Sequence, residues 1–156
     1  MLKKLCNFLD SNKIKYKKIS HSKTETAEQT AQSAHINERE FAKTVMFKVQ
    51  GKMAMAVISA SETIDLELLA TACDVDRVDL ASEEDFSKLF PECETGAMPP
   101  VGNLYNMDVY IEEEMTLNDN ITFNAGSHTE LIQMSMSDYL ALVSPDVVRL
   151  SSAYNE

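Results

Sequence analysis

The chain has few of the residues that build common cofactor and metal sites. It contains only four glycines in 156 residues, and their spacing leaves no glycine-rich loop that could cradle a nucleotide phosphate. Its three cysteines and three histidines are scattered, without the short spacings of a zinc site or the even count of a disulfide framework. These absences argue against a dinucleotide-binding fold, and we expect neither a cofactor nor a bound metal.

Long apolar runs are also absent. No stretch approaches the roughly 20 apolar residues that a membrane-spanning helix needs. The first ten residues alternate charged and apolar side chains, unlike the continuous apolar core of a signal peptide. A chain of this length suffices for one core, so we expect a single cytoplasmic domain over residues 1–156 that makes no membrane contact.

Positive charge is scarce outside one part of the chain. The formal net charge is −11. Residues 1–52 carry 11 Lys and Arg against 5 Asp and Glu, a balance of +6, whereas residues 53–156 carry 3 against 20, a balance of −17. The acidic total argues against broad, salt-driven nucleic-acid binding, which depends on many phosphate contacts, and we expect no DNA partner. A group of lysines near the N-terminus forms either a basic patch or a solvated lysine-rich edge strand. The group is Lys13, Lys15, Lys17, Lys18 and Lys23.

Apolar periodicity predicts a mixture of helices and strands. Alternating residues on either side of the turn Gln50-Gly51-Lys52 predict a β-hairpin with arms at 43–49 and 53–60. Helical spacing predicts helices over residues 2–9, 65–73 and 137–143, and capping patterns predict further helices that begin near Thr26, Asn37 and Ser82. Other strands are expected over 14–19, 77–80, 107–111, 120–124 and 129–136. This order predicts an α+β domain on a largely antiparallel or mixed sheet.

Residues that restrict the backbone gather in one segment, Gly96-Ala97-Met98-Pro99-Pro100-Val101-Gly102. It holds two of the four glycines and two of the four prolines. Proline fixes φ and glycine reaches conformations closed to other residues, so this loop is suited to a preset shape that aims amide groups at a ligand. A tight connection between a helix and the next strand would use the same residues.

Lys43 is unusual for its place in the first hairpin arm. By period-2 alternation it shares a face with Val45, Phe47 and Val49, which predicts that its ammonium points toward the core side, away from the face of Thr44. A partly desolvated lysine at the mouth of a sheet can neutralise an oxyanion or bind a phosphate. The alternative is a lysine whose stem packs while its ammonium reaches solvent.

The segment from Asn124 to Thr129 places a glycine among hydrogen-bonding side chains between two strands, which predicts a binding turn. Ser127 and His128 are adjacent and point apart on an extended chain, which argues against a serine-hydrolase triad. A thiol nucleophile formed by Cys93 with His128 is also open, although most lone cysteines are inert.

Three ordered motifs together resemble the YbaK/prolyl-tRNA-synthetase-associated domain family. They are Lys43-Thr44-Val45, the loop from Glu94 to Gly102, and the segment from Phe123 to Glu130, and their order and separations match as well. The resemblance implies a single domain with a mixed, partly open barrel-like β-sheet flanked by helices. It also implies hydrolysis of the ester that joins a noncognate amino acid to tRNA, usually tRNA for proline.

The resemblance also assigns roles to individual residues. Lys43 matches the family's essential lysine, Gly96 and Pro100 match its Gly-x-x-x-Pro loop, and Gly126, Ser127 and His128 match its Gly-Ser-His turn. Ala97, Met98 and Pro99 differ from the glycine- and serine-rich version of some relatives, which bears on the size of the amino-acid pocket. The remaining expected substrate-binding residues are Gly102, His21 and Thr26, of which the last two either line the acceptor-end pocket or cap the following helix.

Ester hydrolysis builds negative charge on the carbonyl oxygen, which amides between Gly96 and Gly102 can stabilise. Lys43 would hold the terminal ribose or phosphate, and water would attack, activated by the substrate's own groups, with His128 to orient it. The expected partners are the acceptor end of aminoacyl-tRNA and prolyl-tRNA synthetase. Alanine, cysteine and serine are open as the amino acid removed, with alanine first.

Two other functions remain open at this point. One is a deacylase that acts on another small ester or thioester with the same loop. The other is a catalytically silent module that binds aminoacyl-tRNA or a synthetase, since a fold and pocket can persist without turnover.

Overall fold

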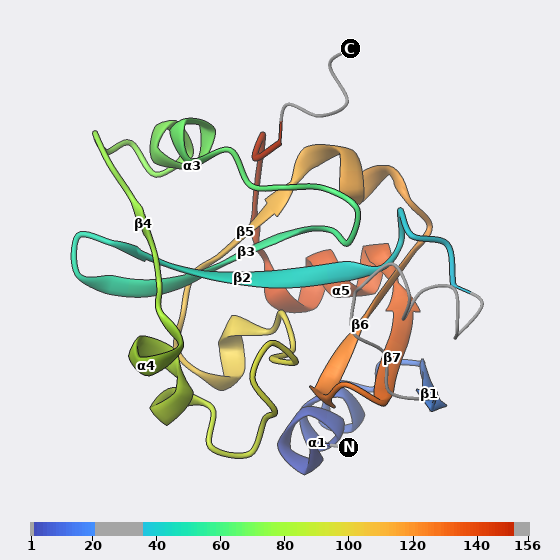
Figure 1. Ribbon diagram of the computed structural model, residues 1–156. Helices are drawn as coiled ribbons and strands as arrows, with labels where there is room; N and C mark the ends of the chain where they lie inside the picture. The colour runs from blue at the N-terminus through green and yellow to red at the C-terminus, as the bar shows by residue number, and fades with distance from the viewer. Residues whose placement is uncertain (1, 21–35, 152–156) are drawn as a thin grey trace.

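The computed structural model of the chain describes residues 2–20 and 36–151, which form two β-sheets with helices around them (Figure 1). The first sheet is antiparallel with the strand order β1-β7-β6. The second is mixed with the order β4-β2-β3-β5-β8, in which β5 runs parallel to both β3 and β8. The expected α+β domain with a mixed sheet is confirmed, and its two sheets do not close into a barrel.

The strands of the first sheet are β1 (Tyr16–Ser20), β6 (Asn120–Ser127) and β7 (Glu130–Ser135). Those of the second are β2 (Ala42–Val49), β3 (Lys52–Ser59), β4 (Asp79–Leu80), β5 (Val109–Glu112) and β8 (Asp146–Val148). The β2–β3 hairpin is confirmed. Gln50 and Gly51 have φ of 50° and 80°, the positive values that a tight two-residue hairpin turn requires.

The described α-helices are α1 (Lys3–Ser11), α3 (Leu66–Ala72), α4 (Glu83–Phe86) and α5 (Met136–Val143). Short 3₁₀-helices cover Ser87–Leu89, Gly102–Leu104 and Glu113–Leu117. Ser82 caps α4 as the sequence predicts, and Asp65, predicted as the first residue of a helix, caps α3. None of these helices is long and apolar enough to cross a membrane.

The expected helix after Asn37 is wrong. The Asn37 side chain accepts a hydrogen bond from the amide of Arg39, at 2.9 Å, and this stabilises a turn over 38–40. The chain enters β2 at Ala42, so too few residues follow Asn37 to complete a helix. The helix expected to begin near Thr26 lies outside the described residues.

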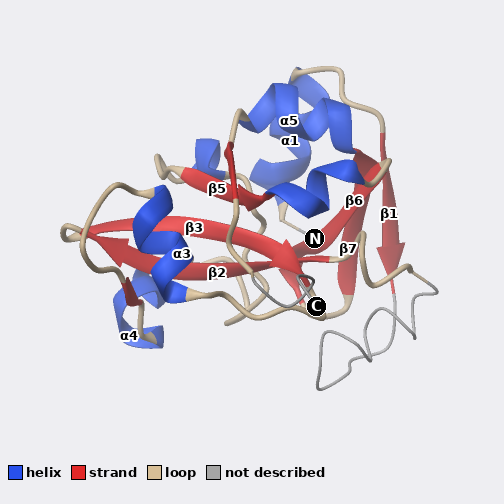
Figure 2. Ribbon diagram, turned by 90° about the horizontal axis from the view of Figure 1, so that it is seen from above, coloured by secondary structure: helices blue, strands red, loops and turns tan. Residues whose placement is uncertain are grey.

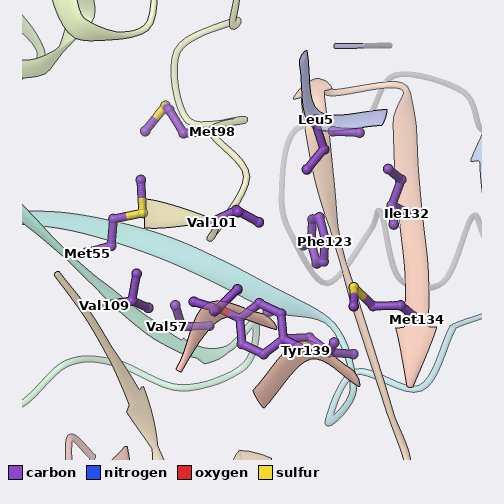
Figure 3. Close-up of a cluster of buried hydrophobic side chains, with 14 of the residues drawn as sticks. Leu5, Met55, Val57, Met98, Val101, Val109, Phe123, Ile132, Met134 and Tyr139 are labelled. Carbon is purple, nitrogen blue, oxygen red and sulfur yellow. The ribbon is translucent and has the colours of Figure 1, made fainter. Parts of the chain in front are cut away.

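The second sheet is covered on both faces. On β2, Ala42 and Met46 belong to the main core, whereas Phe47 lies in a second cluster against Leu69 of α3. Figure 2 shows α3 over β2 and β3, with α1 and α5 on the side of β6. The main core, part of which Figure 3 shows, joins residues of both sheets and of α1 and α5. Alternation along β2 predicts that only the face of Lys43 and Phe47 meets the core, but residues on both faces are buried.

The two sheets meet at one point and then separate. Phe41 forms a parallel bridge with Thr122, and the Thr122 amide donates to the Glu40 carbonyl oxygen at 2.9 Å. Beyond this bridge β2 continues in the second sheet and β6 in the first, so a wedge-shaped gap opens between two strands that run in the same direction. The candidate site is built in this wedge.

Candidate functional site

The loop from Gly96 to Gly102 fills the wedge between the two sheets. From the side of β2, the Thr44 hydroxyl donates to the Met98 carbonyl oxygen at 3.0 Å. From the side of β6, the Gly126 amide donates to the Ala97 carbonyl oxygen, also at 3.0 Å. Gly96 is exposed, whereas the loop is buried from Ala97 onward. Its backbone is therefore held in one conformation by both sheets.

The Gly-Ser-His turn lies directly against the exposed end of this loop. The Glu94 amide donates to the Gly126 carbonyl oxygen at 2.8 Å, and the Glu94 carboxylate accepts from the His128 amide at 3.2 Å. Gly96 and Gly126 both have positive φ, 84° and 93°, which other residues rarely adopt. A Cβ atom on Gly96 would lie 3.5 Å from Cε1 of His128. The structure thus brings Gly96, Gly126 and His128 together.

A hydrogen bond selects the tautomer of the His128 ring. Its Nε2 lies 2.7 Å from the carbonyl oxygen of Thr95. Because a carbonyl oxygen only accepts, Nε2 carries the proton and Nδ1 presents the lone pair. Ser127 instead has its hydroxyl 3.3 Å from a carboxylate oxygen of Glu130, to which it donates. These contacts give Ser127 no path for proton transfer to His128.

The Cys93 thiol lies beside a phenol rather than a base. Its Sγ is 3.7 Å from the hydroxyl of Tyr105, and burial raises the pKa of Cys93 above that of a free thiol. A raised pKa keeps the thiol protonated at neutral pH and makes it a weak nucleophile.

The other end of the loop is fixed by packing. The Tyr139 hydroxyl, fully buried, donates to the Pro100 carbonyl oxygen at 2.6 Å. Gly102 sits so close to the following chain that a Cβ atom there would lie 2.1 Å from the Met107 carbonyl oxygen. The side chains of Ala97 and Met98 are buried in the interior, with 0% and 3% exposure. The side chains of Ala97 and Met98 therefore pack in the core, and Gly96 is the exposed residue of this loop.

Lys43 lies on β2 next to Thr44, but on the opposite face of the strand. It pairs with Ile58 of β3, and it lies near enough to Glu62 for its ammonium to lower the pKa of that carboxyl. Burial is the larger effect and raises the pKa of Glu62 overall, with help from the charges of Glu112 and Glu114. A cavity of about 600 Å³ opens beside Glu62. Lys43 therefore stands at the edge of a polar region that the loop does not occupy.

Register places a further polar residue at the level of Lys43. Lys43 and Asn124 each lie two residues beyond the Phe41–Thr122 bridge, on strands that run in parallel.

A second cavity, of about 700 Å³, lies beside the Gly-Ser-His turn, where Lys3, Lys4 and Asn7 of α1 face Gly126 and Ser127. The described residues contain no cluster of His, Cys, Asp or Glu that could hold a metal ion.

Sequence reasoning missed the residues that hold the loop. Thr44 stands inside the Lys43-Thr44-Val45 motif, so the motif itself was the available signal. Tyr139 and Pro100 are 39 residues apart, and no local pattern joins them. Of the expected site residues, His21 and Thr26 lie outside the described part of the chain.

Several solved structures share the fold. One described as a candidate trans-editing enzyme for prolyl-tRNA synthetase is 20% identical, with 96% of each chain covered and a TM-score of 0.82. The hypothetical protein APE2540 is 17% identical, with 96% of this chain and 99% of that chain covered and a TM-score of 0.85. A scaffold protein from a study of computational epitope grafting is 18% identical, with 96% of each chain covered and a TM-score of 0.81. Among curated proteins, none matches the chain significantly.

A comparison with protein families assigns the chain directly. The aminoacyl-tRNA editing domain matches residues 21–142, which is most of the chain and includes the hairpin, the loop and the Gly-Ser-His turn. The protein therefore belongs to the aminoacyl-tRNA editing domain family.

Proposed function

We propose that this protein is a deacylase that hydrolyses the ester of tRNA for proline carrying a small noncognate amino acid, with alanine as the first candidate. Its family membership supports editing of aminoacyl-tRNA. A similar structure is described as a candidate trans-editing enzyme for prolyl-tRNA synthetase, which supports proline as the tRNA identity and that synthetase as a partner. The observation that carries the proposal is the Gly96–Gly102 loop, which hydrogen bonds fix between Gly126 and Thr44, the residue that follows Lys43 on β2.

At its one exposed residue, Gly96, the loop offers an amide for the charge that develops during ester hydrolysis. Within the loop, Ala97 donates its amide to Glu94 and Val101 donates its amide to Pro99, and prolines have no amide hydrogen. Gly96 is exposed, and no acceptor among the described residues receives its amide hydrogen. We assign this amide to the oxyanion, because a preset donor stabilises that charge without reorganisation.

His128 and Lys43 complete the proposed mechanism. The His128 ring lies beside Gly96, and its Nδ1 lone pair can orient the attacking water, while Nε2 stays bonded to the Thr95 carbonyl. The Lys43 ammonium holds the terminal phosphate or ribose of the tRNA, which keeps the ester near the loop. A second site of this kind is needed because a synthetase discriminates poorly against an amino acid smaller than its own.

Single-turnover deacylation tests the proposal. The substrates are tRNA for proline charged separately with alanine, cysteine, serine and proline. Wild type should release one or more of the noncognate amino acids and leave proline attached, and Lys43→Ala should slow that release by about 100-fold or more, the order of losing one transition-state contact. Lys48→Ala is the matched control, because Lys48 lies on the same strand in a surface ion pair with Asp85. Failure of wild type to release any of these amino acids would refute the proposal.

A further inference from the structure

The first described segment carries positive charge that the rest of the molecule lacks. Residues 3–20, which form α1 and β1 and are called the basic unit below, contain six lysines and one acidic residue, Asp10. Their balance is +5, from 6 minus 1. The whole chain has −11, so the remaining residues carry −16, from −11 minus 5. A single structural unit therefore holds a local charge opposite to that of the molecule.

The charges of the basic unit face solvent. Five of its lysines are exposed: Lys3, Lys13, Lys15, Lys17 and Lys18. The ion pairs among the described residues use Lys4, Lys48 and Arg77. Protection of an exposed sheet edge would explain lysines on β1, which is an edge strand of its sheet. It does not explain Lys3 and Lys13, which lie outside β1.

The basic unit leads directly to the candidate site. The Leu2 amide, at the start of α1, donates to the Ala125 carbonyl oxygen at 3.1 Å, and a Cβ atom on Gly126 would lie 3.1 Å from Cβ of Leu2. Figure 1 shows α1 beside the end of the β6–β7 hairpin that carries the Gly-Ser-His turn. Lys3 and Lys4 line the cavity of about 700 Å³ between α1 and this turn. A polyanion on the basic unit would have one end at the turn.

We propose that the basic unit binds the phosphate backbone of RNA and guides the acceptor end of a tRNA to the Gly-Ser-His turn. This inference rests on the proposed function for its RNA, because an ester at the turn must continue into the acceptor stem. Lysine ammonium groups bind phosphates as point charges and release condensed counterions. The acidic remainder of the molecule repels RNA, so it confines the contact to this surface.

Binding of uncharged, fluorescently labelled tRNA for proline tests the surface without catalysis. In one variant, Lys13, Lys15, Lys17 and Lys18 are changed to Gln. The matched control changes Lys48, Lys52, Arg77 and Lys88 to Gln, so that both variants lose four positive charges. The first variant should bind at least about tenfold more weakly at 0.1 M salt, and the slope of log affinity against log salt should fall by about 3. The control should keep the wild-type slope, because its residues lie elsewhere.

Two results would overturn the RNA surface. One is an equal loss in both variants, which would make net charge the cause. The other is wild-type binding to vesicles rich in phosphatidylserine with no binding to tRNA, which would make the partner a membrane. Lys3→Gln combined with Lys13→Gln provides a second variant that leaves β1 unchanged. It should also weaken tRNA binding, so the test still works where substitutions in β1 unfold the edge strand.

Hydrolysis separates this inference from the function on which it rests. The variant of Lys13, Lys15, Lys17 and Lys18 should lose kcat/KM for intact tRNA for proline charged with alanine. It should hydrolyse alanyl-adenosine at the wild-type rate, because the short ester carries no acceptor stem to bind these lysines. If wild type hydrolyses neither substrate while only the basic variants lose tRNA affinity, the deacylase proposal fails and the RNA surface stands. Equal kcat/KM for wild type and variant on intact tRNA would refute the guiding role.

Discussion

Glu62 has the most consequential ionisation among the residues near Lys43. Burial raises its pKa above the ordinary value of a glutamate, and the charges of Glu112 and Glu114 raise it further. The Ser151 hydroxyl and the Lys43 ammonium lower this pKa, but the net change is upward. The folded chain therefore binds this proton more tightly than the unfolded chain does. The resulting stability is present below the ordinary pKa, about 4.3, and is lost as pH rises through the higher folded pKa.

Removing this charge should stabilise the protein at neutral pH. We expect Glu62→Gln to raise the midpoint of thermal unfolding at pH 7.5, and to change it less at pH 4.5, where the wild-type carboxyl is partly protonated. Asp76→Asn is the control, because Asp76 is exposed and its substitution should change the midpoint little at either pH. A lower midpoint for Glu62→Gln at pH 7.5 would mean that attraction to Lys43 exceeds the effect of burial.

At the scale of elements, the Gly96–Gly102 loop depends on α5. The Tyr139 hydroxyl is fully buried and donates to the Pro100 carbonyl oxygen, so Tyr139→Phe leaves that oxygen without its donor. We expect a loss of about 1–3 kcal/mol in the free energy of unfolding, measured with urea. We also expect slower deacylation, because the amide of Gly96 belongs to the same loop.

Tyr16→Phe is the matched control for this loop. The Tyr16 hydroxyl donates to Asp10 at 2.9 Å in an exposed position, so its loss should change stability by about 0.5 kcal/mol or less. Equal losses for the two variants would show that the Tyr139 hydrogen bond does not hold the loop.

Elements governed by local chemistry could be predicted from the sequence. Gln50 and Gly51 supply the turn residues of the hairpin, and Ser82 with Asp85 supplies a capping box, so each is decided within a few residues. By contrast, β8 has three residues and follows Pro145, and parallel pairing with β5 alone defines it. No period-2 pattern can emerge from so short a strand, and it was missed.

The candidate site shows the same division. Its loop and turn could be located because glycines and prolines gather there, and the positive φ of Gly96 and Gly126 gives the physical reason for two of the glycines. Alternation along β2 places Lys43 and Thr44 on opposite faces of the strand. It could not predict that both faces are buried, because it does not show which elements pack on each face. The contact of Thr44 with Met98 spans 54 residues and needed the structure.

At the scale of the whole molecule, charge is divided between two parts that salt affects in opposite ways. The acidic remainder carries −16, because the chain's −11 includes the +5 of the basic unit, and its self-repulsion opposes the compact state. The basic unit attracts phosphates, and that attraction weakens as salt competes. Screening shortens the range of both, since the Debye length is about 10 Å at 0.1 M and about 3 Å at 1 M.

Raising sodium chloride from about 0.05 to 0.5 M should therefore increase the midpoint of thermal unfolding while it lowers the affinity for tRNA. The two effects have different sources, so they should respond to different substitutions. Asp74→Asn combined with Asp76→Asn, both at exposed positions of the acidic remainder, should reduce the salt-induced rise in stability and leave the salt slope of tRNA binding unchanged. The variant of Lys13, Lys15, Lys17 and Lys18 should do the reverse. If one pair of substitutions changed both salt responses equally, the charge would act as a single net quantity, and the division of the molecule into a basic unit and an acidic remainder would have no functional meaning.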